Sequence, residues 1–198
     1  MSKRLYQFFI LFLGLTAACN LLQGIALMWL GNKLFTQDYF IAWFFIRNIV
    51  SYTGAFFTIK YYRYRNYRAA FNTLSIATGT GLFYSMIYFM LLLGGTVKSY
   101  YLPSLILSLL AGIVYAFTLV FSETGKRIWL RAAGCLMLIL GLITLGSIVW
   151  SLSVREVWVD MLLEKVSRCI IIASSFVFVF FMVHLQGEIK VLKAKNIE

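Results

Sequence analysis

The chain has 198 residues, of which 62% are hydrophobic, 18% are aromatic and only 13% are charged. Water-soluble domains carry roughly 25% charged residues, so this composition excludes an ordinary soluble protein. The excess of 18 Lys and Arg over 7 Asp and Glu suggests nucleic-acid binding in a soluble chain. In so apolar a chain it instead favours cytoplasmic loops and contact with anionic lipid, and we expect no nucleic-acid partner.

Six long apolar runs follow one another along the chain. Each has at most one charged residue and is long enough to cross the hydrocarbon core of a bilayer as a helix. The alternation typical of barrel strands is absent. The sequence therefore predicts an all-α membrane protein, a six-helix bundle in a single domain over residues 1–198. The predicted spans are residues 5–30, 39–59, 71–94, 101–121, 128–150 and 168–186.

The first run begins like a lipoprotein signal. Lys3 and Arg4 precede an apolar stretch that leads to Cys19. The apolar stretch continues past this cysteine to Leu30, where a lipoprotein would become polar. We therefore expect a first membrane span and not a removed signal.

The segment between the last two runs differs from the other connections, which are short. Over residues 153–166, apolar side chains recur at helical spacing and charged residues lie off that stripe. This pattern predicts an amphipathic helix lying on the outer membrane surface. A plain connector is the preferred interpretation, and a lid or partner-docking element is the alternative.

The orientation follows from the distribution of Lys and Arg over the connections. Twelve of them flank the membrane on the side of the two termini, and five lie on the opposite side, at Lys33, Lys98, Arg155, Lys165 and Arg168. Basic residues collect on the cytoplasmic side of membrane proteins. We expect both termini in the cytoplasm, in a plasma or inner membrane.

The densest group of these charges lies in the turn between the second and third runs. Residues 60–68 contain Lys60, Arg63, Arg65 and Arg68 among four tyrosines. This mixture favours an interfacial anchor, with rings at headgroup depth and cations on anionic lipid phosphates. The alternative is a docking surface for a cytoplasmic partner or a regulatory lipid.

Arg47 is the charged residue deepest in a predicted span. It lies nine residues after Asp38, about 13 Å along a helix, and hence near the middle of the membrane. A central arginine costs at least ~2.5 kcal/mol on insertion scales, so it is normally turned inward and paired. No Asp or Glu occurs within the spans. Asp38, Asp160 and Glu164 are the candidate ion-pair partners.

Uncharged polar residues occur at a depth comparable with that of Arg47. The candidate ligand-binding residues beside it are Asn20, Gln23, Ser51 and Ser108, and further hydroxyl groups lie on the third to sixth spans. Together they are consistent with a polar pocket for a small anionic or polar ligand, or a lipid headgroup. The alternative is that Arg47 caps backbone carbonyls and reaches toward the membrane surface, while the hydroxyls bond their own helices.

No pattern of catalytic or cofactor-binding residues is present. His184 is the single histidine, the three cysteines lack metal-site spacing, and the spans contain no acidic residue. We expect no metal and no cofactor. The preferred function is a non-enzymatic transport or solute-binding membrane subunit, with membrane lipids and other membrane subunits as partners. The alternatives are a structural or assembly subunit of a membrane complex and, more remotely, a lipid-modifying enzyme.

Overall fold

The structure, a computed structural model, describes residues 3–30, 38–94, 97–154 and 157–195, with side chains over 5–30, 39–94, 97, 99–154 and 165–191. The helices are α1 (Lys3–Leu30), α2 (Asp38–Tyr64), α3 (Arg68–Leu92), α4 (Lys98–Phe121), α5 (Ile128–Ser153) and α6 (Val157–Lys195), with a 3₁₀ turn, η2 (Glu123–Lys126). These ranges contain no strand. All six α-helices are long and apolar enough to cross a membrane, which confirms the predicted six-helix, all-α architecture.

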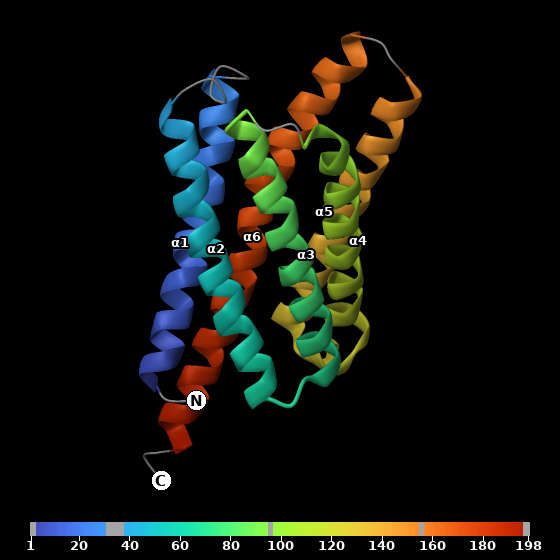
Figure 1. Cartoon of the computed structure of the whole chain (residues 1–198). Helices are drawn as coiled ribbons and strands as arrows, with labels where there is room; N and C mark the ends of the chain where they lie inside the picture. Colours follow the sequence, from blue (N-terminus) through green and yellow to red (C-terminus); the bar gives the residue numbers. More distant parts are fainter. Residues whose placement is uncertain (1–2, 31–37, 95–96, 155–156, 196–198) are drawn as a thin grey trace.

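The helices form a closed ring. Each packs against the helix before and after it in the chain, and α6 completes the ring by packing along α1. Figure 1 shows both termini at the same end of this ring, which we call the termini end. Helix α2 packs more loosely against α1 and α3 than the other neighbours pack against each other. All six helices therefore surround one central region.

Helix α6 corrects one prediction. A separate surface helix over residues 153–166 and a span starting at 168 were expected, but the chain forms one helix of 39 residues from Val157 to Lys195. Figure 1 shows it running obliquely through the bundle and extending beyond its neighbours at the end opposite the termini. No glycine or proline occurs between residues 157 and 186 to end the helix. The sequence changes from amphipathic to apolar near residue 168, but the helix continues through this change.

Two glycines allow close helix packing. A Cβ atom on Gly134 of α5 would lie 2.7 Å from Leu119 Cβ and 3.0 Å from the Ala116 carbonyl oxygen of α4. A Cβ atom on Gly24 of α1 would lie 2.4 Å from Ile172 Cγ1 of α6. Gly146, also on α5, has no such neighbour within 4 Å. The α4–α5 and α1–α6 contacts thus depend on particular small residues, as is common in membrane helix pairs.

The turn between α2 and α3 is closed by a left-handed residue. Asn66 has a φ of 58°. Its amide donates to the Arg63 carbonyl at 3.3 Å, and the Tyr67 amide donates to the Tyr62 carbonyl at 3.0 Å. This is the Schellman arrangement, in which two otherwise free carbonyls at a helix end are satisfied. Asparagine is, after glycine, among the residues that best tolerate this conformation.

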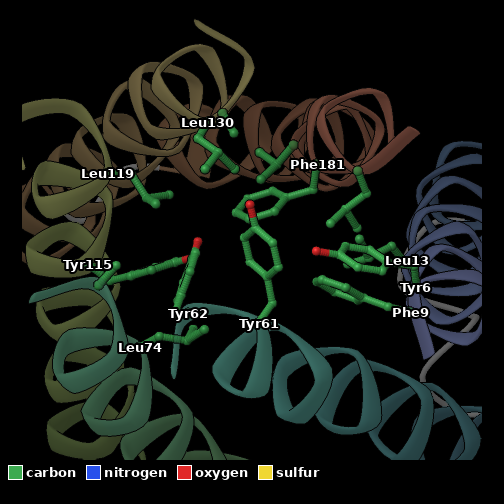
Figure 2. Close-up of a cluster of buried hydrophobic side chains, with 14 residues drawn as sticks. Tyr6, Phe9, Leu13, Tyr61, Tyr62, Leu74, Tyr115, Leu119, Leu130 and Phe181 are labelled. Carbon is green, nitrogen blue, oxygen red and sulfur yellow. The ribbon is translucent and has the colours of Figure 1, made fainter. Parts of the chain in front are cut away.

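A core of aromatic side chains fills the termini end of the ring. Tyr61 and Tyr62 of α2 are fully buried, and Figure 2 shows them pointing into the bundle toward Phe181 and Tyr115. Tyr6 and Phe9 of α1 pack against the Tyr61 ring. For these two tyrosines this differs from the expectation of rings at headgroup depth, whereas Tyr64 of the same turn is exposed. Because α2 continues to Tyr64, past the predicted end at residue 59, its inner face still points into the core there.

Candidate binding cavity

A cavity of about 690 Å³ lies at the centre of the ring, and residues from all six helices line it. Its lining changes in character along its length. Toward the termini end the walls are largely apolar, with Leu13, Leu74, Met137 and Phe181 among them. Toward the opposite end the walls carry most of the polar groups, which are Gln23, Arg47, Asn48, Tyr52, Tyr84, Ser85, Tyr88, Tyr101, Ser108, Ser167 and Arg168. The cavity is therefore amphipathic.

Arg47 is held in this wall by one hydrogen bond. Its Nε–H donates to Asn20 Oδ1 of α1 at 3.1 Å, and Asn20 Nδ2 in turn donates to Ser174 Oγ of α6 at 3.3 Å. The terminal guanidinium nitrogens of Arg47 have no hydrogen-bond partner among the described residues, and no described carboxylate lies within ion-pair distance. The planar end of the guanidinium group is thus left available beside the cavity.

The wall between α2 and α3 is closed by hydrogen bonds between side chains. Ser85 Oγ of α3 donates to Asn48 Oδ1 of α2 at 3.1 Å. Tyr52 OH lies 2.8 Å from Ser85 Oγ and, because the serine proton is already used, Tyr52 is the donor. Asn48 Nδ2 donates to the Phe44 carbonyl at 2.8 Å. These three side chains, which we call the α2–α3 wall, join two otherwise apolar helix faces.

The structure brings most of the predicted ligand-binding residues together. Gln23, Arg47, Ser51 and Ser108 all line the cavity. Asn20 is buried behind Arg47 and contacts it. The proposed ion-pair partners are not placed, because the side chains of Asp38, Asp160 and Glu164 lie outside the described residues.

Other cavity residues did not figure in the prediction. Asn48 and Tyr52 lie one residue further along α2 than Arg47 and Ser51, and Arg168 brings a second cationic side chain into the lining. Tyr52 and Tyr84 also line the cavity. Their i, i+4 spacing with Asn48 and Tyr88 was a usable signal, but the prediction followed only the single stripe through Arg47.

The basic turn is more firmly bound to the bundle than its composition indicates. Arg65 is hydrogen-bonded and ion-paired to the buried Glu188 of α6. Lys60, Arg63 and Arg68 are exposed, and Lys60 Nζ lies 4.6 Å from the centre of the Phe56 ring. In the next turn at this end, a hydrogen bond with Tyr67 raises the pKa of Arg127 above its ordinary value. Three of the four predicted lipid-contacting cations are thus exposed, and the fourth bonds internally.

His184 is part of the same internal network. The Tyr61 hydroxyl and His184 Nε2 are joined by a hydrogen bond of 2.7 Å, and both side chains are buried. His184 Nε2 lies 3.9 Å from Glu188 Oε1, and Tyr6 OH donates to Glu188 Oε2 at 3.4 Å. The network lies at the termini end, below the apolar half of the cavity, and links α1, α2 and α6.

Comparisons with protein-family models, curated proteins and solved structures find no match to this chain. Its class therefore comes from its own structure, which is a ring of six apolar helices around an amphipathic cavity.

Proposed function

We propose that this protein is an integral membrane protein that binds a small anionic or polar solute in its central cavity, as a solute-binding or transport subunit. The observation that carries the proposal is Arg47, a cation of a spanning helix whose terminal guanidinium nitrogens have no hydrogen-bond partner among the described residues and which lines a cavity of about 690 Å³. A charged residue in mid-membrane is costly and marks a functional position by default. A planar guanidinium suits a carboxylate or phosphate, because it can donate two parallel hydrogen bonds.

The other cavity residues favour the same class of ligand. The hydroxyls of Ser51, Ser108 and Tyr84 provide hydrogen-bond donors near the charge, and Arg168 brings a second cation into the lining. In a site with little water, such donors act more strongly on an anion than they do at a protein surface. The lining thus combines charge with directional groups.

The chemistry of the lining favours binding over catalysis. The cavity residues that the structure describes include no carboxylate, thiol or imidazole. Hydrolysis or group transfer needs a nucleophile with a base, or ligands for a metal. His184 is hydrogen-bonded to Tyr61, and Glu188 to Arg65, at the termini end. Neither His184 nor Glu188 belongs to the cavity lining. We therefore propose a non-enzymatic role.

The proposed orientation places the termini end in the cytoplasm. Lys60, Arg63 and Arg68 are exposed there and are positioned to contact anionic lipid, which is enriched in the cytoplasmic leaflet. The polar half of the cavity then faces the outer half of the membrane.

Thiol accessibility tests the proposal without a known solute. In a chain with Cys19, Cys135 and Cys169 replaced by alanine, Ser108→Cys puts a thiol in the cavity. Val114→Cys, on an exposed face of α4 outside the cavity, is the matched control. We expect a small anionic methanethiosulfonate reagent to modify position 108 about tenfold faster than a cationic one of similar size, because the arginines attract anions. Arg47→Gln abolishes that preference. If position 108 reacts no faster than position 114, no solute site exists.

Assembly of a larger membrane complex is the second candidate. The hydrogen-bond chain from Arg47 through Asn20 to Ser174 connects α2, α1 and α6, and so favours a structural role for the arginine. In that case Arg47→Gln lowers the stability of the bundle, or the recovery of partner subunits in mild detergent. The ratio of anionic to cationic labelling at position 108 then stays the same as before the substitution.

A further inference from the structure

A groove of about 520 Å³ lies on the α2–α3 face of the ring. Its lining is apolar along most of its length, with Phe45, Ile49 and Phe56 from α2 and Leu82, Met86 and Phe89 from α3. Four of these side chains are half or more exposed, and in a spanning bundle such a face is open to the acyl chains of the bilayer. From Phe45 to Phe56 the groove extends about 16 Å along α2, close to the ~15 Å that one leaflet contributes to the hydrocarbon core.

The groove and the central cavity share the same wall. Phe44, Asn48, Tyr52 and Ser85 line both spaces. The last three are the α2–α3 wall, so an apolar groove on the membrane side has polar groups at its base. Arg47 directly precedes Asn48 and lines the cavity on the other side of this wall. The apolar groove and Arg47 thus lie at the same level of the bundle, on opposite sides of the α2–α3 wall.

The contact between these two helices is among the weaker ones of the ring. Between Asn48, Tyr52 and Ser85, two hydrogen bonds bridge α2 and α3, and a single hydrogen bond contributes little net stability. A polar headgroup is able to replace both bonds with its own, because Asn48 and Ser85 each offer a donor and an acceptor. A ligand that comes from the bilayer would therefore have to break few contacts to reach Arg47 between α2 and α3.

We propose that the ligand of the cavity is an anionic lipid. Its headgroup binds Arg47 inside the ring, while an acyl chain leaves between α2 and α3 and lies in the groove from Ile49 toward Phe56. The inference rests on the proposed function, because it uses the same arginine and cavity. It specifies the substrate class as an amphiphile and the route of entry as lateral.

The test uses the full chain in detergent micelles and two probes with the same phosphate monoester group. Dioleoyl phosphatidic acid has acyl chains, and glycerol 3-phosphate has none; dioleoyl phosphatidylcholine is the neutral control. The double variant Ile49→Trp/Met86→Trp fills the groove. The variant Ile46→Trp/Met90→Trp places the same rings on positions of the same helices that are also half or more exposed but lie outside it. Affinities are measured by native mass spectrometry or by the concentration dependence of thermal stability.

We expect the wild-type chain to retain phosphatidic acid in preference to phosphatidylcholine, with Arg47→Gln weakening it at least tenfold. The groove-filling variant weakens phosphatidic acid to a similar extent and leaves any binding of glycerol 3-phosphate unchanged, whereas the control variant resembles wild type. Equal binding of phosphatidic acid by the two tryptophan variants, or no retention of it by the wild type, overturns the lipid inference. The solute site itself is overturned separately, by an Arg47→Gln variant that binds every probe as the wild type does.

Discussion

The ion pair between Arg65 and Glu188 allows a quantitative test of the termini-end network. The Glu188 side chain is only 8% exposed, whereas that of Arg65 is 32% exposed. Replacing Arg65 with methionine leaves a buried carboxylate whose remaining polar neighbours among the described side chains are Tyr6 and His184. Breaking a fully buried pair costs about 3–5 kcal/mol, and the partial exposure of the arginine reduces this to ~2 kcal/mol here.

The opposite substitution is expected to be milder. Glu188→Leu leaves the arginine, which is able to turn toward water or lipid phosphate, so the free energy of unfolding falls by ~1 kcal/mol or less. In the double variant no charge is left unpaired. Its destabilisation should therefore be only ~1 kcal/mol, smaller than that of Arg65→Met alone, which corresponds to a coupling energy of ~2 kcal/mol.

Reversible unfolding in mixed detergent and SDS micelles, followed by far-ultraviolet circular dichroism, measures these free energies. Arg63→Met is the matched control, because it removes the same charge from the same turn at an exposed position and should change stability by no more than ~0.5 kcal/mol. The reasoning is refuted if Arg65→Met resembles Arg63→Met. It is also refuted if the double variant loses the sum of the two single losses.

Three further predictions concern packing and turn geometry, each measured by the same unfolding assay. Gly134→Val should destabilise the bundle by more than ~2 kcal/mol because its side chain meets the α4 backbone, whereas Gly146→Val should be nearly neutral; equal effects would contradict close α4–α5 packing. Asn66→Ala should cost about 1 kcal/mol and Asn66→Gly should not, and the reverse order would exclude the left-handed turn. Tyr62→Phe should cost about 1–2 kcal/mol because it leaves the buried Tyr115 hydroxyl unpaired, and adding Tyr115→Phe should recover part of that loss; a further loss would argue against their 2.8 Å hydrogen bond.

The six helices were predictable because a membrane span is recognised by length and composition alone, without knowledge of its neighbours. The neighbourhood of Arg47 was partly predictable for a related reason. Residues at similar distances from a span end lie at similar depth, so Asn20 and Gln23 were placed near Arg47 before any packing was known. Depth is contained in the sequence.

The rotation of each helix about its own axis cannot be predicted from the sequence in the same way as its depth. These helices are apolar on most sides, so their sequences do not say which face points inward, and that choice depends on packing. Asn48 and Tyr52 of the α2–α3 wall were missed for this reason, whereas Ser85 was among the hydroxyl groups expected near Arg47. The burial of Tyr61 was missed because the charges around it indicated a turn, whereas α2 continues to Tyr64 and its inner face still carries Tyr61 and Tyr62 into the core.

The closure of the ring by α6 on α1 has a consequence for synthesis of the chain. Asn20 and Arg47 come from the first hairpin, so the arginine acquires its partner early, when only two helices have been made. The bonds that join the two ends of the chain, Asn20 to Ser174 and Tyr6 to Glu188, span 154 and 182 residues and wait for the last helix. Until then the bundle is an open arc, and the future cavity is open along the side that α6 later closes.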